Sequence, residues 1–212
     1  MVHVGENPGF YWEHGWVTIQ EAIWGFILAF LVAVVVATAM AHSRFIERAT
    51  MPVIVVIQSM PVLVLVPVFV LWFGFSTWPK ILTAALFAWI PFVANALTGF
   101  RSIDEESHEL LRSVHASKWE IYWRLRVPHS LPYLFSAARI CVSLALVGAV
   151  VGEFFNSTQG LGNTARVAQS RVLIDQLWGS IFVLALIGIT FVLAVIAAER
   201  RVLRWHSSQD SL

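Results

Sequence analysis

The sequence predicts an all-α membrane protein, a polytopic bundle of about five transmembrane helices, and three observations support this fold class. Hydrophobic residues make up 58% of the 212 residues and charged residues only 13%, whereas a soluble domain carries about 25% charged residues. The mean hydropathy is +0.74, so the surplus of apolar side chains has to face something other than water. Apolar segments of about 20 residues, the length that crosses a bilayer as a helix, occur five times along the chain.

The predicted transmembrane domain covers residues 17–198. Its five spans are residues 17–41, 51–73, 81–100, 133–152 and 177–198. Glu21 lies near the start of the first span. Pro61 and Pro67 interrupt the second, and because proline removes a backbone donor and obstructs the preceding turn, we expect a kink or a break there. The third span contains Pro91 and Asn95.

The distribution of basic residues orients these spans. Segments 42–50, 101–131 and 199–212 share one side of the predicted topology and hold ten of the 14 Lys and Arg residues, against three on the other side. Cytoplasmic loops are the ones enriched in Lys and Arg. We therefore predict an extracytoplasmic segment 1–16 and a cytoplasmic tail 199–212. Arg139 lies within the fourth span and is expected to extend toward the cytoplasmic interface.

Several classes of function find no support in the residues. No basic face is available to neutralise phosphates, which argues against nucleic acid. The phosphate loop G-x-x-x-x-G-K-[ST] and the patterns H-E-x-x-H, G-x-S-x-G and C-x-x-C do not occur, so we predict no catalytic residue, no metal site and no cofactor. The single cysteine, Cys141, lies in an apolar run and is predicted to be a packing residue.

One connection is too long to be a simple link. Residues 101–131 join the third and fourth spans, and loops of this length usually carry structure or function. We predict two short helices in it. Asp104 caps the first, and Ser117 begins the second, because Ser117 and Glu120 fit the capping box S-x-x-E.

The second loop helix is unusually aromatic for a cytoplasmic segment. It is predicted to run to about Arg126, where Pro128 and Pro132 stop it before the fourth span. Its aromatic residues include Trp119 and Trp123, mixed with basic residues. Such a surface suits either the membrane interface or a groove on a partner protein, where aromatic and arginine side chains dominate binding.

Residues 109–132 resemble the "EAA" loop of binding-protein-dependent ABC importer permeases. The positions that fit this motif are Glu109, Ala116, Ser117, Pro128, Leu131 and Pro132. His115 stands where the motif has glycine, and histidine adopts a positive φ less readily. The resemblance implies a coupling helix that enters a cleft of a separate ATPase. The residues expected to form this contact are Glu109, Ala116, Ser117, Trp119, Trp123, Pro128 and Pro132.

The resemblance extends from about residue 12 to residue 205. Segments 58–61 (QSMP), 71–74 (LWFG), 95–104 (NALTGFRSID), 150–154 (VVGEF) and 160–162 (GLG) are similar to the nitrate, sulfonate and taurine branch, which also contains carriers of vitamin precursors. It implies a type I ABC importer permease in a prokaryotic inner membrane. The implied partners are an ATPase dimer, an extracytoplasmic substrate-binding protein and a second permease copy. Members of this branch usually have one more span at the N-terminus.

Polar groups at membrane depth are the candidates for the transport pathway. Asn95 is one, although an interhelical hydrogen bond explains it equally well. Glu153, at the outer end of the fourth span, is the other; it could line the pathway, contact the binding protein or simply lie at the interface. Gly148 and Gly152 form a G-x-x-x-G pair, which allows a neighbouring helix to approach closely.

Two rival functions differ from the permease in testable ways. A stand-alone channel or facilitator does not need an aromatic coupling loop. An intramembrane enzyme needs paired catalytic groups at one depth, and the sequence indicates none. The substrate stays open at this point, because a small anion and an uncharged heterocycle are both compatible with a mostly apolar pathway.

Overall fold

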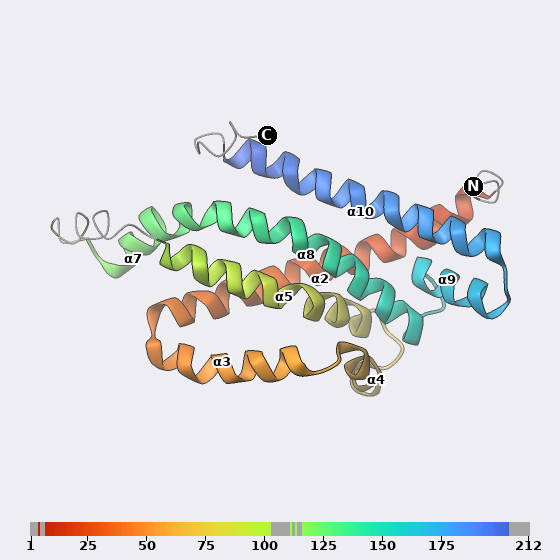
Figure 1. The fold of residues 1–212 in the computed structure, drawn as a ribbon, viewed down its shortest axis with the longest axis horizontal. Helices are drawn as coiled ribbons and strands as arrows, with labels where there is room; N and C mark the ends of the chain where they lie inside the picture. Colours follow the sequence, from red (N-terminus) through yellow and green to blue (C-terminus); the bar gives the residue numbers. More distant parts are fainter. Residues whose placement is uncertain (1–3, 5–6, 103–110, 112, 114–115, 204–212) are drawn as a thin grey trace.

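The computed structural model describes residues 4, 7–102, 111, 113 and 116–203 of the chain. Within these residues the secondary structure is helical throughout and contains no strand. Four helices are long and apolar enough to cross a membrane, and a bent pair provides a fifth candidate span. The predicted all-α bundle of about five spans is therefore confirmed. Helix α7 (Lys118–Ile121) lies at one end of the bundle, and α9 (Leu161–Ser170) lies at the other end, near the start of the first long helix (Figure 1).

Helix α2 (Pro8–His42) contains the first predicted span and begins about nine residues earlier than expected. Pro8 suits the first turn of a helix, because its missing N–H would have no partner there in any case. A helix of 35 residues is about 50 Å long, whereas the hydrocarbon core is about 30 Å thick. Helix α2 is therefore longer than the apolar layer is thick.

The second predicted span is a broken helix. Helices α3 (Arg44–Ser59) and α4 (Val62–Phe73) meet at an angle of 98°, and Pro61 lies at the break in extended conformation. The predicted interruption is confirmed at Pro61, while Pro67 lies inside α4 and does not end it. Within the described chain each of these helices buries only one side chain, Ile54 in α3 and Val66 in α4.

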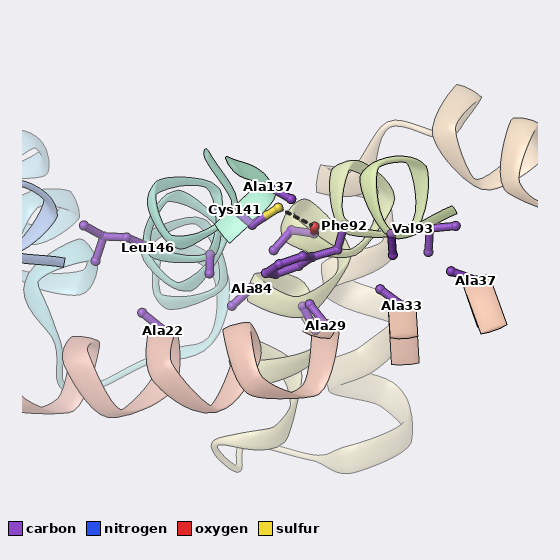
Figure 2. Packing of buried hydrophobic residues seen from close by; sticks show 14 of the residues in the cluster. Ala22, Ala29, Ala33, Ala37, Ala84, Phe92, Val93, Ala137, Cys141 and Leu146 are labelled. Atoms are coloured by element: carbon purple, nitrogen blue, oxygen red, sulfur yellow. Dashed lines mark hydrogen bonds between the residues drawn. The ribbon is translucent and has the colours of Figure 1, made fainter. Parts of the chain in front are cut away.

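Helices α2, α5 (Trp78–Arg101) and α8 (Val127–Asn156) form the core. Small residues let the three backbones approach closely, as in other membrane helix pairs. One face of α2 buries the alanines at 22, 29, 33 and 37, which pack near Ala84 and Phe92 of α5 (Figure 2). Cys141 is fully buried there and donates from Sγ to the Ala88 carbonyl at 3.1 Å, which agrees with a packing role.

The G-x-x-x-G pair of α8 lies directly against α5. A Cβ atom at Gly148 would stand 2.6 Å from the Cα of Ala84, and one at Gly152 would stand 2.8 Å from the Cα of Lys80. Both distances are too short for a side chain, so glycine is required at these positions. The predicted close approach is thus confirmed, and its partner is a helix of the same chain.

The predicted stop at Pro128 and Pro132 is wrong. Helix α7 (Lys118–Ile121) runs through a π-helical turn, η1 (Tyr122–Arg126), directly into α8 without an intervening loop. Pro128 falls in the first turn of α8 and Pro132 lies inside it. A proline within a helix cannot donate to the carbonyl four residues earlier and its ring obstructs that carbonyl, and a widened turn is one way to accommodate this.

Two helices complete the fold. Helix α9 (Leu161–Ser170) is short and was not expected from the sequence. Helix α10 (Ile174–Val202) contains the fifth predicted span and packs loosely, burying only Gly179, Ser180 and Ile187. Near its end Glu199 accepts a hydrogen bond from Nε of Arg139 at 2.7 Å. Arg139 therefore forms an ion pair between α8 and α10 near the end of α10 that carries Arg200 and Arg201, a contact that the sequence did not indicate.

Candidate functional site

Helix α7 begins with the predicted capping box. The backbone N–H of Ser117 donates to the Glu120 carboxylate at 2.9 Å, and the backbone N–H of Glu120 donates to Oγ of Ser117 at 3.2 Å. Each side chain thus satisfies the other residue's free backbone donor. The Ala116 N–H donates to the carbonyl of Leu111 at 3.0 Å. Glu109 and His115 lie outside the described residues.

The aromatic side chains of this segment point in two directions. Trp119 and Trp123 are 67% and 52% exposed, whereas Tyr122 is only 8% exposed. The two indole rings lie one helical turn apart, with centroids 5.6 Å from each other. The sequence alone does not separate Tyr122 from the two tryptophans, because all three are aromatic residues of one short segment.

Tyr122, the first residue of η1, joins α7 and η1 to the end of α2. Its hydroxyl is 2.8 Å from Oγ1 of Thr38, and its ring lies 5.4 Å from the ring of His42 and 5.8 Å from that of Phe100. Nη1 of Arg126 donates to the Ala41 carbonyl at 3.4 Å. We call the contacts of Tyr122 and Arg126 with α2 the α7 anchor. It holds one face of the segment to the bundle and leaves the tryptophans free on the other.

Asn95 plays a local part in α5. Its Nδ2 donates to the carbonyl of Pro91 at 2.9 Å, in the preceding turn of the same helix. The expected interhelical hydrogen bond is therefore not the contact that Asn95 makes. The side chain is half-buried and bonds to the backbone of its own helix.

A buried charge cluster lies at the opposite end of the bundle. Lys80 of α5 reaches Oε1 of Glu21 in α2 at a distance of 2.7 Å, and the two residues are 7% and 2% exposed. Nζ of Lys80 also donates to Oγ of Ser157 at 3.2 Å. Since a buried ion costs several kcal/mol unless it is paired, each of these two charges depends on the other.

Glu153, a predicted pathway residue, lies beside this pair and is fully buried. Its Oε1 accepts from the hydroxyl of Thr18 at 2.6 Å, and its Oε2 accepts from the backbone N–H of Gly162 at 2.5 Å. Glu153 thus binds the first turn of α9, where free N–H groups and the helix dipole favour a negative charge. This arrangement supports a structural role rather than an exposed position in the pathway.

Two residues of α2 hold the same turn. The backbone N–H of Gly160 donates to Nδ1 of His14 at 3.0 Å, and that of Leu161 donates to Oγ1 of Thr18 at 2.9 Å. Three successive backbone donors of the α9 start are therefore satisfied by side chains of α2 and α8. We call His14, Thr18, Glu21, Lys80 and Glu153 together the α9 anchor.

Glycine is required at the entrance to α9. Gly160 has φ of +97°, a conformation that side chains rarely adopt, and a Cβ atom there would overlap the Glu153 carboxyl. The segment GLG at 160–162 is thus explained by its contact with Glu153. Sequence reasoning found Glu153 and this segment but did not connect them with Thr18 or Lys80. The sequence did hold one indication of this contact. Thr18, Lys80 and Glu153 lie at the ends of the first, third and fourth predicted spans that share one side of the membrane.

The described residues contain no group of three or more His, Cys, Asp or Glu side chains placed to hold a metal ion. The α9 anchor instead combines two carboxyl groups with one ammonium group and one helix N-terminus. Its side chains accept hydrogen bonds from the backbone N–H groups at the start of α9 and pair Lys80 of α5 with Glu21 of α2.

Comparison with known proteins places these features in a family. The sequence profile described as "Binding-protein-dependent transport system inner membrane component" matches residues 22–205. The formylaminopyrimidine transport permease protein ThiX of Halalkalibacterium halodurans is 34% identical over 185 residues, which are 87% of this chain and 74% of that protein. The riboflavin transport system permease protein RibX of Chloroflexus aurantiacus is 34% identical over 95% of this chain and 75% of its own length.

Solved structures agree with the fold. An inward-facing MetNI methionine ABC transporter chain superimposes with a TM-score of 0.76 at 16% identity, over 88% of this chain and 93% of that one. At this identity the match speaks for the fold alone. Together with the apolar spans, the family match shows a multi-pass inner-membrane protein. The chain belongs to the family of binding-protein-dependent transport system inner membrane components, and it is the permease subunit of an ABC importer.

Proposed function

We propose that α7 and η1 dock this permease onto a separate ATPase through Trp119 and Trp123. The observation that carries this proposal is the orientation of the two indole rings, which are more than half exposed on a segment whose other face is held to α2. Exposed aromatic side chains on a rigid helix are typical of residues that dominate protein interfaces. A segment fixed at Tyr122 and continuous with α8 transmits a push from the ATPase directly into the bundle.

This proposal includes an orientation. Segments 42–50, 101–131 and 199–212 hold ten of the 14 Lys and Arg residues, which favours the cytoplasm for that side. The N-terminal end of α2 and the α9 anchor then lie on the extracytoplasmic side. Figure 1 agrees with this orientation, because α7 and the N-terminal end of α2 lie at opposite ends of the bundle.

We further propose that two copies of this chain enclose the pathway. Within the described residues α3 and α4 bury one side chain each, although many of their apolar residues are exposed. These include Phe45, Val53, Val55, Val64, Leu71 and Trp72. A large unpacked apolar face on a bent span suits a two-fold contact with the same face of a second copy.

For the solute we propose a small nitrogen heterocycle. The two relatives at 34% identity are named for formylaminopyrimidine and riboflavin, whereas a taurine permease of Escherichia coli is 27% identical. The sequence left open a small anion and an uncharged heterocycle, and this proposal favours the heterocycle. It is tested by uptake of a labelled pyrimidine in cells that express the complete importer, with unlabelled riboflavin and taurine as competitors. Competition by taurine alone would overturn it.

The docking proposal is tested by co-purification with a candidate ATPase subunit. The variant carries Trp119→Ala and Trp123→Ala, and the matched control carries Trp12→Ala and Trp16→Ala. The control pair has the same spacing in sequence, is also at least half exposed and lies at the other end of the bundle. We expect the W119A/W123A permease to lose the ATPase, because each truncation of a buried interface aromatic costs about 2 kcal/mol or more.

The control permease should retain the ATPase and reach the membrane in the same amount. If both variants bind the ATPase as the wild type does, the docking element lies elsewhere. Solute uptake that continues without an ATPase would favour the stand-alone channel, the rival that does not need the coupling segment.

A further inference from the structure

The turn between α9 and α10 has an unusual backbone. The N–H of Leu173 donates to the Ala168 carbonyl at 2.8 Å, and the N–H of Val172 donates to the Gln169 carbonyl at 3.2 Å. These two hydrogen bonds define a Schellman motif, in which the residue after the helix cap adopts a left-handed conformation. Glycine usually fills that position, and here it is Val172, with φ of +57°.

A β-branched residue in this conformation is strained. Among the described residues Val172 is the only one other than glycine with a positive φ. Strain of this kind persists when the surrounding structure enforces it, and it tends to occur at functional sites. The α9 anchor provides that enforcement, because it ties the start of α9 to α2 and α8 about two turns before Ala168.

The strained turn presents aliphatic side chains to the outside. Val172 is 77% exposed, Leu173 44% and Ile174 61%. Packing within the chain does not account for a valine at position 172, since its side chain is mostly exposed. Exposed Arg171 and Asp175 flank the three aliphatic residues. We call residues 171–175 the outer tip.

The outer tip lies beyond the apolar layer. Arg200 and Arg201 mark the other end of α10, and a hydrocarbon core of about 30 Å takes up about 20 helical residues before them. This count ends near Ser180 and the predicted span begins at residue 177, so Ile174 lies about 5–9 Å farther out and Val172 farther still. Three clustered aliphatic side chains at that height lie outside the hydrocarbon core and are available to a partner protein.

We propose that the outer tip is a docking knob for the extracytoplasmic solute-binding protein of this importer, with Val172 inserted into an apolar hollow of that protein. The family is defined by dependence on such a binding protein, and the proposal rests on the orientation given under the proposed function. A rigid, preorganised knob loses little conformational freedom on binding, which is what the strained and stapled backbone provides. Arg171 fits a carboxylate at the rim of the hollow.

Two substitutions at position 172 separate the contact from the strain. Asparagine adopts the left-handed conformation more readily than valine but removes the aliphatic surface, so V172N relieves strain and deletes the knob. Isoleucine keeps both the strain and the aliphatic surface, so V172I is the conservative control. Both variants leave the backbone hydrogen bonds of the turn and the α9 anchor in place.

The experiment uses the complete importer in lipid nanodiscs, with the binding protein that stimulates ATP hydrolysis by the wild-type complex. The affinity for this binding protein is measured by titration, and thermal stability is measured in parallel. We expect V172N to bind it about tenfold more weakly, as the loss of one buried aliphatic side chain predicts, with unchanged or higher thermal stability. V172I should bind within about twofold of the wild type.

Equal affinity of V172N and the wild type would overturn the proposal, as would a loss of affinity in V172I that matches the loss in V172N. A lower thermal stability of V172N in nanodiscs with unchanged affinity would show instead that the tip anchors the protein to lipid. Failure of every binding protein to stimulate the wild type would contradict the proposed importer function itself, and that result is distinct from an effect confined to V172N.

Discussion

The α9 anchor and the α7 anchor hold helical segments at opposite ends of the same bundle by different means. The α9 anchor uses ionisable side chains that are almost completely buried, with Glu21, Lys80 and Glu153 between 0% and 7% exposed and with an ion pair between Glu21 and Lys80. The α7 anchor uses one hydroxyl contact, aromatic packing and a long hydrogen bond from Arg126. A buried charge without its partner is costly, whereas a neutral hydrogen bond contributes only about 1 kcal/mol.

This contrast indicates that the α9 end of the bundle stays fixed during transport and that the α7 end moves. Opening the α9 anchor would expose or separate several charges at once, so the turn it holds should remain fixed while the transporter works. The α7 anchor can be distorted at a small cost, and it adjoins the π-helical turn η1, a form that is frequent at functional positions. We therefore expect the ATPase to act on the bundle through the α7 end.

The largest effect is expected from Lys80→Ala. This change leaves the Glu21 carboxylate buried and unpaired, which should destabilise the permease by about 3–5 kcal/mol. Thermal unfolding of the purified protein, followed by loss of the monodisperse species, measures this. Combining Glu21→Gln with Lys80→Met removes both charges and should restore most of the stability. If K80A alone unfolds at the wild-type temperature, the pair does not stabilise the fold.

A smaller effect is expected from Glu153→Ala. The hydroxyl of Thr18 and the N–H of Gly162 lose their acceptor, at a cost of about 1–3 kcal/mol. The effect stays below that of K80A because E153A leaves the ion pair between Glu21 and Lys80 in place. Hydrogen exchange should quicken at Leu161 and Gly162 while the amides of α5 stay protected. Glu153→Gln keeps an acceptor and should retain more protection; equal exchange in both variants would contradict the contact.

The smallest effect on stability is expected from Tyr122→Phe at the α7 anchor. It removes one hydroxyl and keeps the ring, so the cost should be about 1 kcal/mol. The informative measurement is the number of ATP molecules hydrolysed per solute imported, which should rise because the coupling segment is less firmly joined to α2. Thr38→Val should have the same effect, and the double variant should add nothing. A Y122F effect on stability as large as that of K80A would remove the contrast between the two anchors.

Much of the architecture follows from local patterns. Apolar length predicted the spans, Pro61 predicted the broken second span, and Gly148 and Gly152 predicted a close helix contact. The capping box at Ser117 was also predictable, because its two partners are three residues apart. The fate of Pro128 was not, since whether a proline ends a helix or widens it depends on the packing of the turns on either side.

By itself, the sequence determined the membrane class, the approximate spans and the resemblance to importer permeases, because these depend on composition, period and short motifs. Only the tertiary structure decided that Tyr122 faces inward while Trp119 and Trp123 face outward. It also decided that Glu153 binds α9 and that Val172 is held in a strained turn. These features join residues from different helices, and their geometry depends on how the helices pack, which one-dimensional spacing does not contain.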